Sequence, residues 1–233
     1  VQVRVLLNDE RAFGGRERLE AEELSLKNSN NLLVVEQLMA ISKKENLGLE
    51  ALGVKTDRGC VVTDGLGRTN VPGIYAIGDV AGPPMLAHKA EHEGVLCVEG
   101  IKGLHVHAMD KLKIPGCTYC HPQVASVGLT EAKAKEAGYQ IKVGKFPFLA
   151  NSRARSSGNT EGMVKILSDS QNDRILGAHI IGPDAGTLIA EIVAYMEFGG
   201  AAEDIARTCH AHPTLNEAIR EAALAVDKRA INI

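Results

Sequence analysis

The sequence has few aromatic residues, no tryptophan and no long apolar run, and each absence excludes a class of protein. Aromatic residues make up 3% of the chain, which leaves little to stack on nucleic-acid bases. The formal net charge of −3 gives no electrostatic reason to expect nucleic acid or an anionic membrane surface as a partner. No segment reaches the roughly 20 apolar residues that span a bilayer. We therefore expect no nucleic-acid partner and no membrane association.

Two sequence fingerprints are also missing. The chain has neither the Gly-x-Gly-x-x-Gly pattern of a dinucleotide site nor a Cys-x-x-x-x-Cys pair. Its five cysteines are an odd number and are scattered, so we expect no disulfide framework. A reducing compartment suits this composition better than a secreted one.

Hydrophobic periodicity predicts mixed secondary structure. The apolar run 32–41 fits a buried strand or a short helix equally well. Runs of strands followed by helices predict the α+β class for the second half of the chain, and "HAMDKLKIPG" at 107–116 is a plausible domain boundary. The strands expected from alternation are 1–7, 59–65, 71–82, 123–129, 140–148, 162–169 and 174–182. The helices expected are 84–101, 130–138, 185–200 and 214–226.

The segment "CHAHPTLNEA", residues 209–218, has a structural interpretation. Thr214 and Glu217 have the spacing of a capping box, in which the threonine side chain accepts a helix amide and the glutamate reaches back to the threonine amide. In that interpretation Glu217 only starts a helix.

The same segment also has a catalytic interpretation. Pro213 disfavours helical angles at His212, so the imidazole projects from a fixed, extended position. Glu217 can accept one ring N–H, which sets the tautomer and leaves the other nitrogen free. That arrangement is typical of a general base and its orienting acid.

Zinc binding is a third possibility for these residues. Cys209, His210 and His212, together with "CTYCH" at 117–121, offer ligands that zinc accepts. The chain has only one Cys-x-x-Cys pair and no second pair at a suitable spacing. We therefore expect no metal site, and we interpret His210 as a buried, hydrogen-bonded residue.

Several segments together resemble the C-terminal half of dihydrolipoamide dehydrogenase, an FAD-dependent family of pyridine nucleotide-disulfide oxidoreductases also called E3. The resemblance extends from about Leu47 to the C-terminus, and the His-Pro-Thr-x-x-Glu ending is shared with glutathione reductase and its relatives. It implies oxidation of dihydrolipoamide through a redox disulfide and FAD, with NAD as acceptor. The segments that carry it are 73–94, 142–154, 162–167, 176–186 and 203–222.

The resemblance implies roles for particular residues. His212 would be the catalytic base and Glu217 its orienting acid, acting on the redox disulfide of the other subunit. Asp79 would contact the ribityl chain of FAD. The turn that enters a helix beside the flavin ring would stabilise negative charge on the reduced flavin. That turn is Met85, Leu86, Ala87 and His88.

The resemblance also implies three domains and several partners. Residues 1–50 would be a remnant of the NAD-binding domain and 51–115 the C-terminal part of the FAD-binding and central domain. Residues 116–233 would be the interface (dimerisation) domain, with an antiparallel sheet and helices. We expect a homodimer that serves the lipoyl domain of a 2-oxo-acid dehydrogenase complex, in the bacterial cytoplasm or the mitochondrial matrix.

The chain departs from the family pattern in ways that limit these expectations. Ser42, in "AISKKEN" (40–46), occupies the family's glycine position beside NAD. With neither a pyrophosphate-binding fingerprint nor a redox cysteine pair, we expect the C-terminal portion of a longer enzyme or a truncated paralogue. We expect this chain alone to bind FAD weakly or not at all and to be inactive. The alternatives are another flavoprotein disulfide reductase, of the glutathione or mercuric reductase type, and a non-catalytic dimerisation module.

Overall fold

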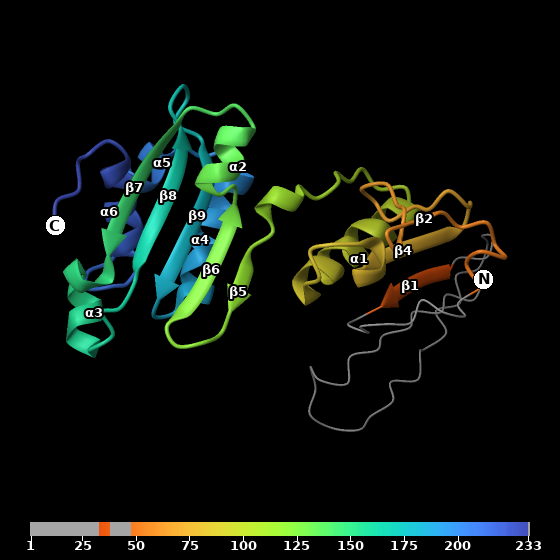
Figure 1. Cartoon of the computed structure of the whole chain (residues 1–233), viewed down its shortest axis with the longest axis horizontal. Coiled ribbons are helices and arrows are strands. Elements are labelled where there is room, and N and C mark those ends of the chain that lie inside the picture. Colours follow the sequence, from red (N-terminus) through yellow and green to blue (C-terminus); the bar gives the residue numbers. More distant parts are fainter. Residues whose placement is uncertain (1–32, 38–47, 233) are drawn as a thin grey trace. The chain divides into compact units, whose positions relative to one another are not determined.

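The computed structural model describes residues 33–37 and 48–232, and the chain divides into two compact units, residues 1–109 and 110–233 (Figure 1). The expected strand at 1–7 lies outside the described residues. The boundary between the units falls within the segment 107–116. The finer division of the first unit into NAD and FAD parts stays a prediction.

The first unit is built on a parallel pair of strands, β1 (Leu33–Gln37) and β4 (Ile74–Gly78). The ambiguous run 32–41 therefore contains a strand. The short β2 (Thr56–Asp57) and β3 (Cys60–Val61) form a hairpin, and β3 lies within the segment 59–65, where a short strand and turn were expected. After β4 the chain makes the 3-10 turn η1 (Asp79–Ala81) and enters α1 (Ala87–Ile101), which packs on β4.

The second unit is an antiparallel sheet with helices packed on it, which confirms the α+β class. Its strand order is β5-β6-β9-β8-β7, and α4 packs on β6 and β9 while α6 packs on β7 and β8 (Figure 1). The strands are β5 (Gly116–Thr118), β6 (Gln123–Gly128), β7 (Ile141–Pro147), β8 (Met163–Asp169) and β9 (Ile175–Gly182). The helices are α2 (Glu131–Glu136), α3 (Ser152–Ser157), α4 (Ala185–Glu197), α5 (Ala202–Arg207) and α6 (Glu217–Val226). Two 3-10 turns complete the unit, η2 (Lys111–Lys113) and η3 (Phe148–Ala150).

The core of the second unit lies between the sheet and its helices. Ile166 and Ile180 on the strands are fully buried, as are Ile192 on α4 and Ile219 on α6. Helix α6 lies close to β7 because residue 144 is glycine. A Cβ there would stand 2.0 Å from the backbone oxygen of Ala222. The position of α6, and of everything it carries, therefore depends on this close approach.

A buried carboxylate on α6 holds the residues that follow the helix. Glu221 is 1% exposed. One carboxylate oxygen accepts the backbone N–H groups of Ile231 and Asn232 at 2.7 and 3.2 Å, and the other accepts the Asn232 side-chain amide at 2.9 Å. These hydrogen bonds satisfy an acid that would be costly to bury alone.

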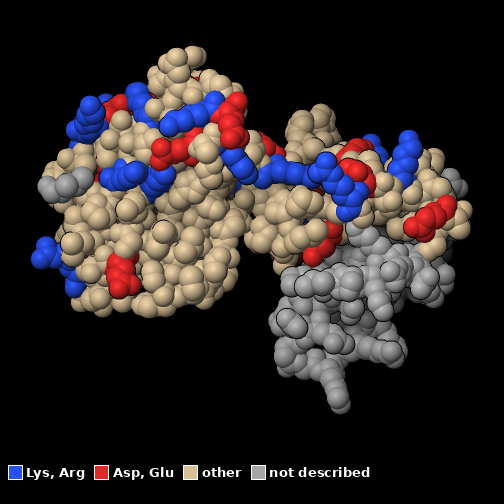
Figure 2. Space-filling view, in the orientation of Figure 1, with Lys and Arg blue, Asp and Glu red and all other residues tan. Residues whose placement is uncertain are grey.

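The surface of the second unit carries charges of both signs. Figure 2 shows Lys and Arg interspersed with Asp and Glu on the visible face, rather than gathered by sign. The ion pair Lys142–Asp227, at 2.9 Å, is one example. Across the described ranges, no helix combines the length and the apolar character needed to cross a bilayer.

Candidate active site

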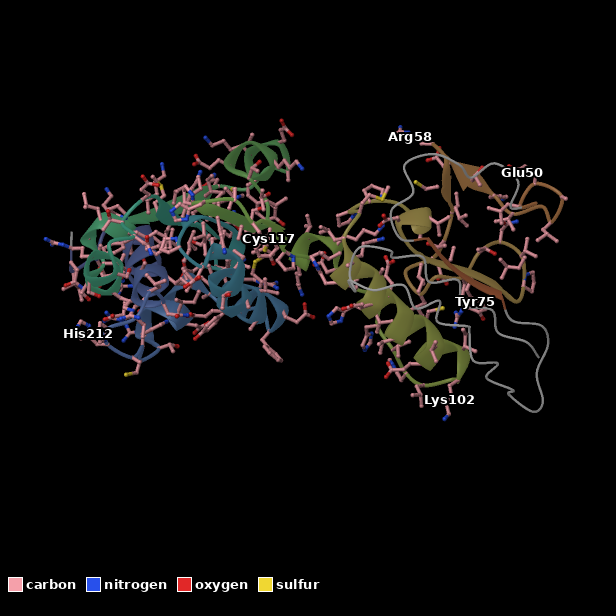
Figure 3. All side chains as sticks on the ribbon, turned by 90° about the horizontal axis from the view of Figure 1, so that it is seen from below. Glu50, Arg58, Tyr75, Lys102, Cys117 and His212 are labelled. Carbon is pink, nitrogen blue, oxygen red and sulfur yellow. The ribbon has the colours of Figure 1, made fainter. Side chains whose placement is uncertain are left out.

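His212 lies on the loop between α5 and α6, and its side chain is 68% exposed. Figure 3 shows it at the margin of the second unit. Its Nδ1 is 2.9 Å from Glu217 Oε1 and 3.2 Å from Oε2. The structure therefore brings together the two residues that the sequence selected as base and orienting acid.

The contact with Glu217 sets the tautomer of the His212 ring. An ionised carboxylate can only accept, so Nδ1 carries the hydrogen and donates it. Among the described residues, Nε2 makes no hydrogen bond. In the neutral ring this nitrogen is an exposed acceptor, as a general base requires.

Glu217 has a second hydrogen bond that belongs to the helix start. Its Oε2 accepts the Thr214 backbone N–H at 2.9 Å, which is one half of the expected capping box. The other half is wrong, because the Thr214 hydroxyl donates to the Ala211 carbonyl at 2.7 Å. Helix α6 consequently begins at Glu217, with Asn216 as its N-cap. One carboxylate thus both orients the His212 imidazole and orders the entry to the helix.

The surroundings of Glu217 keep it ionised. Partial burial raises the pKa of its carboxyl group, but the hydrogen bonds from the Thr214 amide and from His212, together with the charges of His212 and Arg220, lower it by more. The net pKa lies below the ordinary value for glutamate. At neutral pH the group is therefore an anion that accepts hydrogen bonds and does not donate them.

The loop that carries His212 is anchored to α4 by contacts that the sequence did not predict. Glu191 on α4 accepts a hydrogen bond from Asn216 Nδ2 at 2.7 Å and lies 2.7 Å from Nε2 of His210. The His210 side chain is 6% exposed, and its Nδ1 donates to the Thr208 carbonyl at 2.9 Å. His210 is buried and hydrogen-bonded as expected. The one signal that could have revealed Glu191 is an acid in the middle of an otherwise apolar helix.

A hollow of about 560 Å³ adjoins this anchor. Its lining includes Arg207, Cys209, His210, Glu217 and Arg220, but not His212. It therefore lies beside Glu217 and not at Nε2 of His212.

The candidate flavin residues lie on one loop and the helix start that follows it. Asp79 opens η1 and is half-buried, and Met85 is 51% exposed. Leu86 is the N-cap of α1 and has no side chain capping that end. The first turn, which contains Ala87 and His88, also has no acidic residue. The positive end of a helix of 15 residues is thus not neutralised by a local side chain, which suits the negative charge of a reduced flavin.

Two regions of this chain match known protein families. Residues 114–223 match the dimerisation domain of the pyridine nucleotide-disulphide oxidoreductases, and residues 2–94 match a second domain of the same family. The chain belongs to the pyridine nucleotide-disulphide oxidoreductase family. This membership confirms the resemblance drawn from the sequence motifs.

Curated relatives in this family are dihydrolipoyl dehydrogenases. One from Rhizobium etli is 60% identical over 189 residues, which are 81% of this chain and 39% of the relative. The mitochondrial dihydrolipoyl dehydrogenase of Sus scrofa is 56% identical over 190 residues, 81% of this chain and 37% of the relative. The chain therefore spans less than two fifths of the length of either protein.

Solved structures of the family have the same fold. LpdA from Mycobacterium tuberculosis is 28% identical, with a TM-score of 0.72 over 76% of this chain and 39% of that chain. The HOCl-induced flavoprotein disulfide reductase RclA from Escherichia coli is 26% identical, with a TM-score of 0.70 over 80% of this chain and 43% of that chain.

The remaining sequence candidates are placed as follows. Ser42 lies outside the described residues. All five cysteines are free thiols, and Cys120 and Cys209 are exposed. Within residues 48–232, no group of three or more His, Cys, Asp and Glu side chains is arranged to hold a metal ion.

Proposed function

We propose that this chain is the C-terminal part of a dihydrolipoyl dehydrogenase, in which His212 is the catalytic base and Glu217 its positioning residue. The observation that carries the proposal is the 2.9 Å contact between His212 Nδ1 and Glu217, with Nε2 exposed. The 54–60% identity to dihydrolipoyl dehydrogenases supports the same conclusion.

The chemistry assigned to His212 is proton removal from a thiol. Nε2 takes the proton of one dihydrolipoamide S–H, because only the thiolate is an effective nucleophile. The thiolate forms a bond to one sulfur of the redox disulfide, whose S–S bond breaks and releases the other cysteine as a thiolate. The second thiol of dihydrolipoamide gives its proton to the cysteine thiolate already released, and its sulfur attacks the lipoamide sulfur of the mixed disulfide, so that this S–S bond breaks and the other cysteine leaves as a thiolate. Lipoamide leaves with its ring disulfide closed, and the enzyme disulfide is reduced by two electrons.

Glu217 contributes by stabilising the imidazolium that forms. Its ionised carboxylate lies against Nδ1 when Nε2 becomes protonated, so the new positive charge is paired at once. The contact also fixes the ring orientation, which keeps Nε2 directed outward.

FAD and NAD complete the proposed reaction. When bound, FAD would supply a two-electron acceptor for the dithiol, with NAD as the final acceptor. Asp79 would hold the ribityl chain, and the α1 N-terminus at Met85–His88 would lie at the flavin ring. The half-buried Asp79 and the helix end without a side-chain cap fit these uses. Ser42 is proposed to lie near NAD on the sequence resemblance alone.

The assembly assigned to the protein is a homodimer in which His212 serves the disulfide of the other subunit. The match of residues 114–223 to a dimerisation domain supports this assignment. The proposed partner is the lipoyl domain of a 2-oxo-acid dehydrogenase complex, in the bacterial cytoplasm or the mitochondrial matrix.

The decisive experiment uses the complete enzyme that contains this chain. Replacing His212 by Gln should lower the rate of dihydrolipoamide oxidation by about 10²–10⁴-fold, as expected for loss of a general base. Glu217→Gln should lower it less, because Nε2 is retained. His107→Gln, at an exposed position in the first unit, is the matched control. If His212→Gln keeps the rate of the control variant, the proposal fails.

The isolated 233-residue chain should bind little or no FAD and have no turnover, because it has no redox cysteine pair. Flavin absorbance that copurifies with the chain would contradict this expectation.

A second candidate function, a non-catalytic dimerisation module, is favoured by the same dimerisation-domain match. A stable flavin-free dimer on size-exclusion chromatography, with no active longer form in the source organism, would support it. Assays of the complete enzyme with glutathione and with mercuric ion test the remaining alternative, a flavoprotein disulfide reductase of the glutathione or mercuric reductase type.

A further inference from the structure

The first unit buries a positive charge next to the candidate flavin loop. The Lys89 side chain on α1 is 0% exposed. Its ammonium donates to the backbone carbonyls of Gly78 and Gly82, both at 2.8 Å, and lies 3.1 Å from Glu93 Oε2. An ammonium group has three donors, so each one has an acceptor.

Glu93 closes this arrangement from one helical turn further along α1. Its Oε2 accepts the Gly78 backbone N–H at 2.7 Å. Both backbone groups of Gly78 and the carbonyl of Gly82 are therefore held by two side chains of a single helix. The segment between them is η1, which begins with Asp79.

The backbone at both ends of this loop explains why it needs to be held. Gly78 has a φ of 71° and Gly82 a φ of 100°. Glycine reaches such conformations readily, but it also reaches many others. Without restraint, the loop would therefore sample several shapes, and the backbone position of Asp79 would vary with them.

Packing alone does not explain the choice of lysine. A buried ion pair is often no more stabilising than apolar side chains of similar volume. Lys89 directs two of its three hydrogen bonds to loop carbonyls, which an apolar side chain cannot do. Its distinctive contribution is to select one loop conformation.

We propose that Lys89 and Glu93 are positioning residues that hold the Gly78–Gly82 loop in the form that presents Asp79 to the ribityl hydroxyls of FAD. This inference rests on the proposed flavin role of Asp79. The pair pre-organises the loop, so the cofactor does not have to order it on binding.

The first test measures loop order in the 233-residue chain by amide hydrogen exchange. Lys89→Met keeps the length of the side chain and removes its charge. It should speed exchange at residues 78–82 by about tenfold or more, because hydrogen bonds from a charged group are lost. Exchange in the second half of α1, residues 95–101, should change little. Lys102→Met, at an exposed position just after the same helix (Figure 3), is the matched control.

Two results would overturn the inference. One is loop exchange no faster than in the Lys102 control. The other is an equal acceleration throughout α1, because the pair would then stabilise the fold in general. If Lys89→Met does not fold, Glu93→Gln is the milder change. It leaves an acceptor for the Gly78 amide and should speed loop exchange by a smaller factor that is still confined to residues 78–82. No increase in that variant also overturns the inference.

The second test measures FAD affinity in the complete flavoprotein. Lys89→Met should raise the FAD dissociation constant by about tenfold or more, in line with the loosened loop. Unchanged affinity despite faster loop exchange would overturn the inference. Asp79→Asn tests the proposed function separately. If that variant binds FAD normally, the flavin role of Asp79 fails, while the exchange result on Lys89 still reports whether the pair orders the loop.

Discussion

The close approach of α6 to β7 makes Gly144→Ala a sharp test of how the site is positioned. The added methyl group would stand 2.0 Å from the Ala222 backbone oxygen and 2.6 Å from the Val226 backbone nitrogen. Ordinary contact begins near 3.4 Å, and neither of these atoms belongs to a side chain that can turn away. The helix must therefore retreat from the strand by more than about 1 Å, which opens the packing around Ile219.

The expected cost follows from the kind of clash. Overpacking a core typically costs about 1–3 kcal/mol, and a clash with backbone belongs at the upper end. We expect Gly144→Ala to lower the free energy of unfolding by about 2–3 kcal/mol. Urea unfolding of the chain, followed by far-UV circular dichroism, measures it. With a slope of about 1–3 kcal/mol per molar urea, the midpoint should fall by roughly 0.7–3 M.

Gly116→Ala is the matched control for this experiment. It is the same chemical change in the same sheet, but its Cβ would lie 3.9 Å from the nearest atom, Ser126 Oγ. It should stay within about 0.5 kcal/mol of the parent chain. Both variants replace glycine by alanine, so the effect of this change on the unfolded state cancels when their free energies of unfolding are compared. Equal stability of the two would refute the argument that Gly144 sets the position of α6.

Two further predictions concern buried groups. Burial and the nearby Asp64 carboxylate raise the pKa of the Cys97 thiol to about 11, so a thiol reagent at pH 8 should label the exposed Cys120 and Cys209 and leave Cys97 unlabelled until the chain unfolds. Rapid labelling of Cys97 in the folded chain, seen by mass spectrometry, would contradict this. Burial lowers the pKa of His179 below its ordinary 6.5, so the folded state favours the neutral imidazole. The free energy of unfolding therefore decreases as the pH falls below 6.5 toward the lowered pKa of the folded state. His179→Gln should therefore lose less unfolding free energy than the parent between pH 7 and pH 5, and equal losses would disprove the assignment.

Local signals in the sequence predicted the elements that depend on local contacts. Thr130 accepts the Lys133 amide at 3.2 Å, and Gly138, with a φ of 86°, follows the end of α2, as the spacing indicates. His212 and Glu217 are five residues apart, and their contact needs only the proline and the helix start between them. Such features are visible in a sequence because their partners are near in the chain.

Features that depend on distant partners were missed. Helix α5 was not predicted, since its first turn is held by Asp173 from the turn between β8 and β9, whose carboxylate accepts the Glu203 amide at 2.9 Å. Lys89 and Glu93 have the spacing of an ordinary surface pair on a helix. Only the fold shows that the loop carbonyls bury this lysine.

The hydrogen bonds from Ile231 and Asn232 to Glu221 tie the residues that follow α6 to the helix that carries Glu217. Glu221 follows Glu217 by one helical turn of α6, so a displacement of the helix at Glu221 also moves Glu217. Proteolytic trimming before residue 231 would leave an acid inside the protein with Arg220, at 3.5 Å, as its closest remaining charge. Such an acid captures a proton or draws in water, and either event disturbs the helix that orients His212. Residues after the helix thus help to fix the orientation of His212, the proposed base.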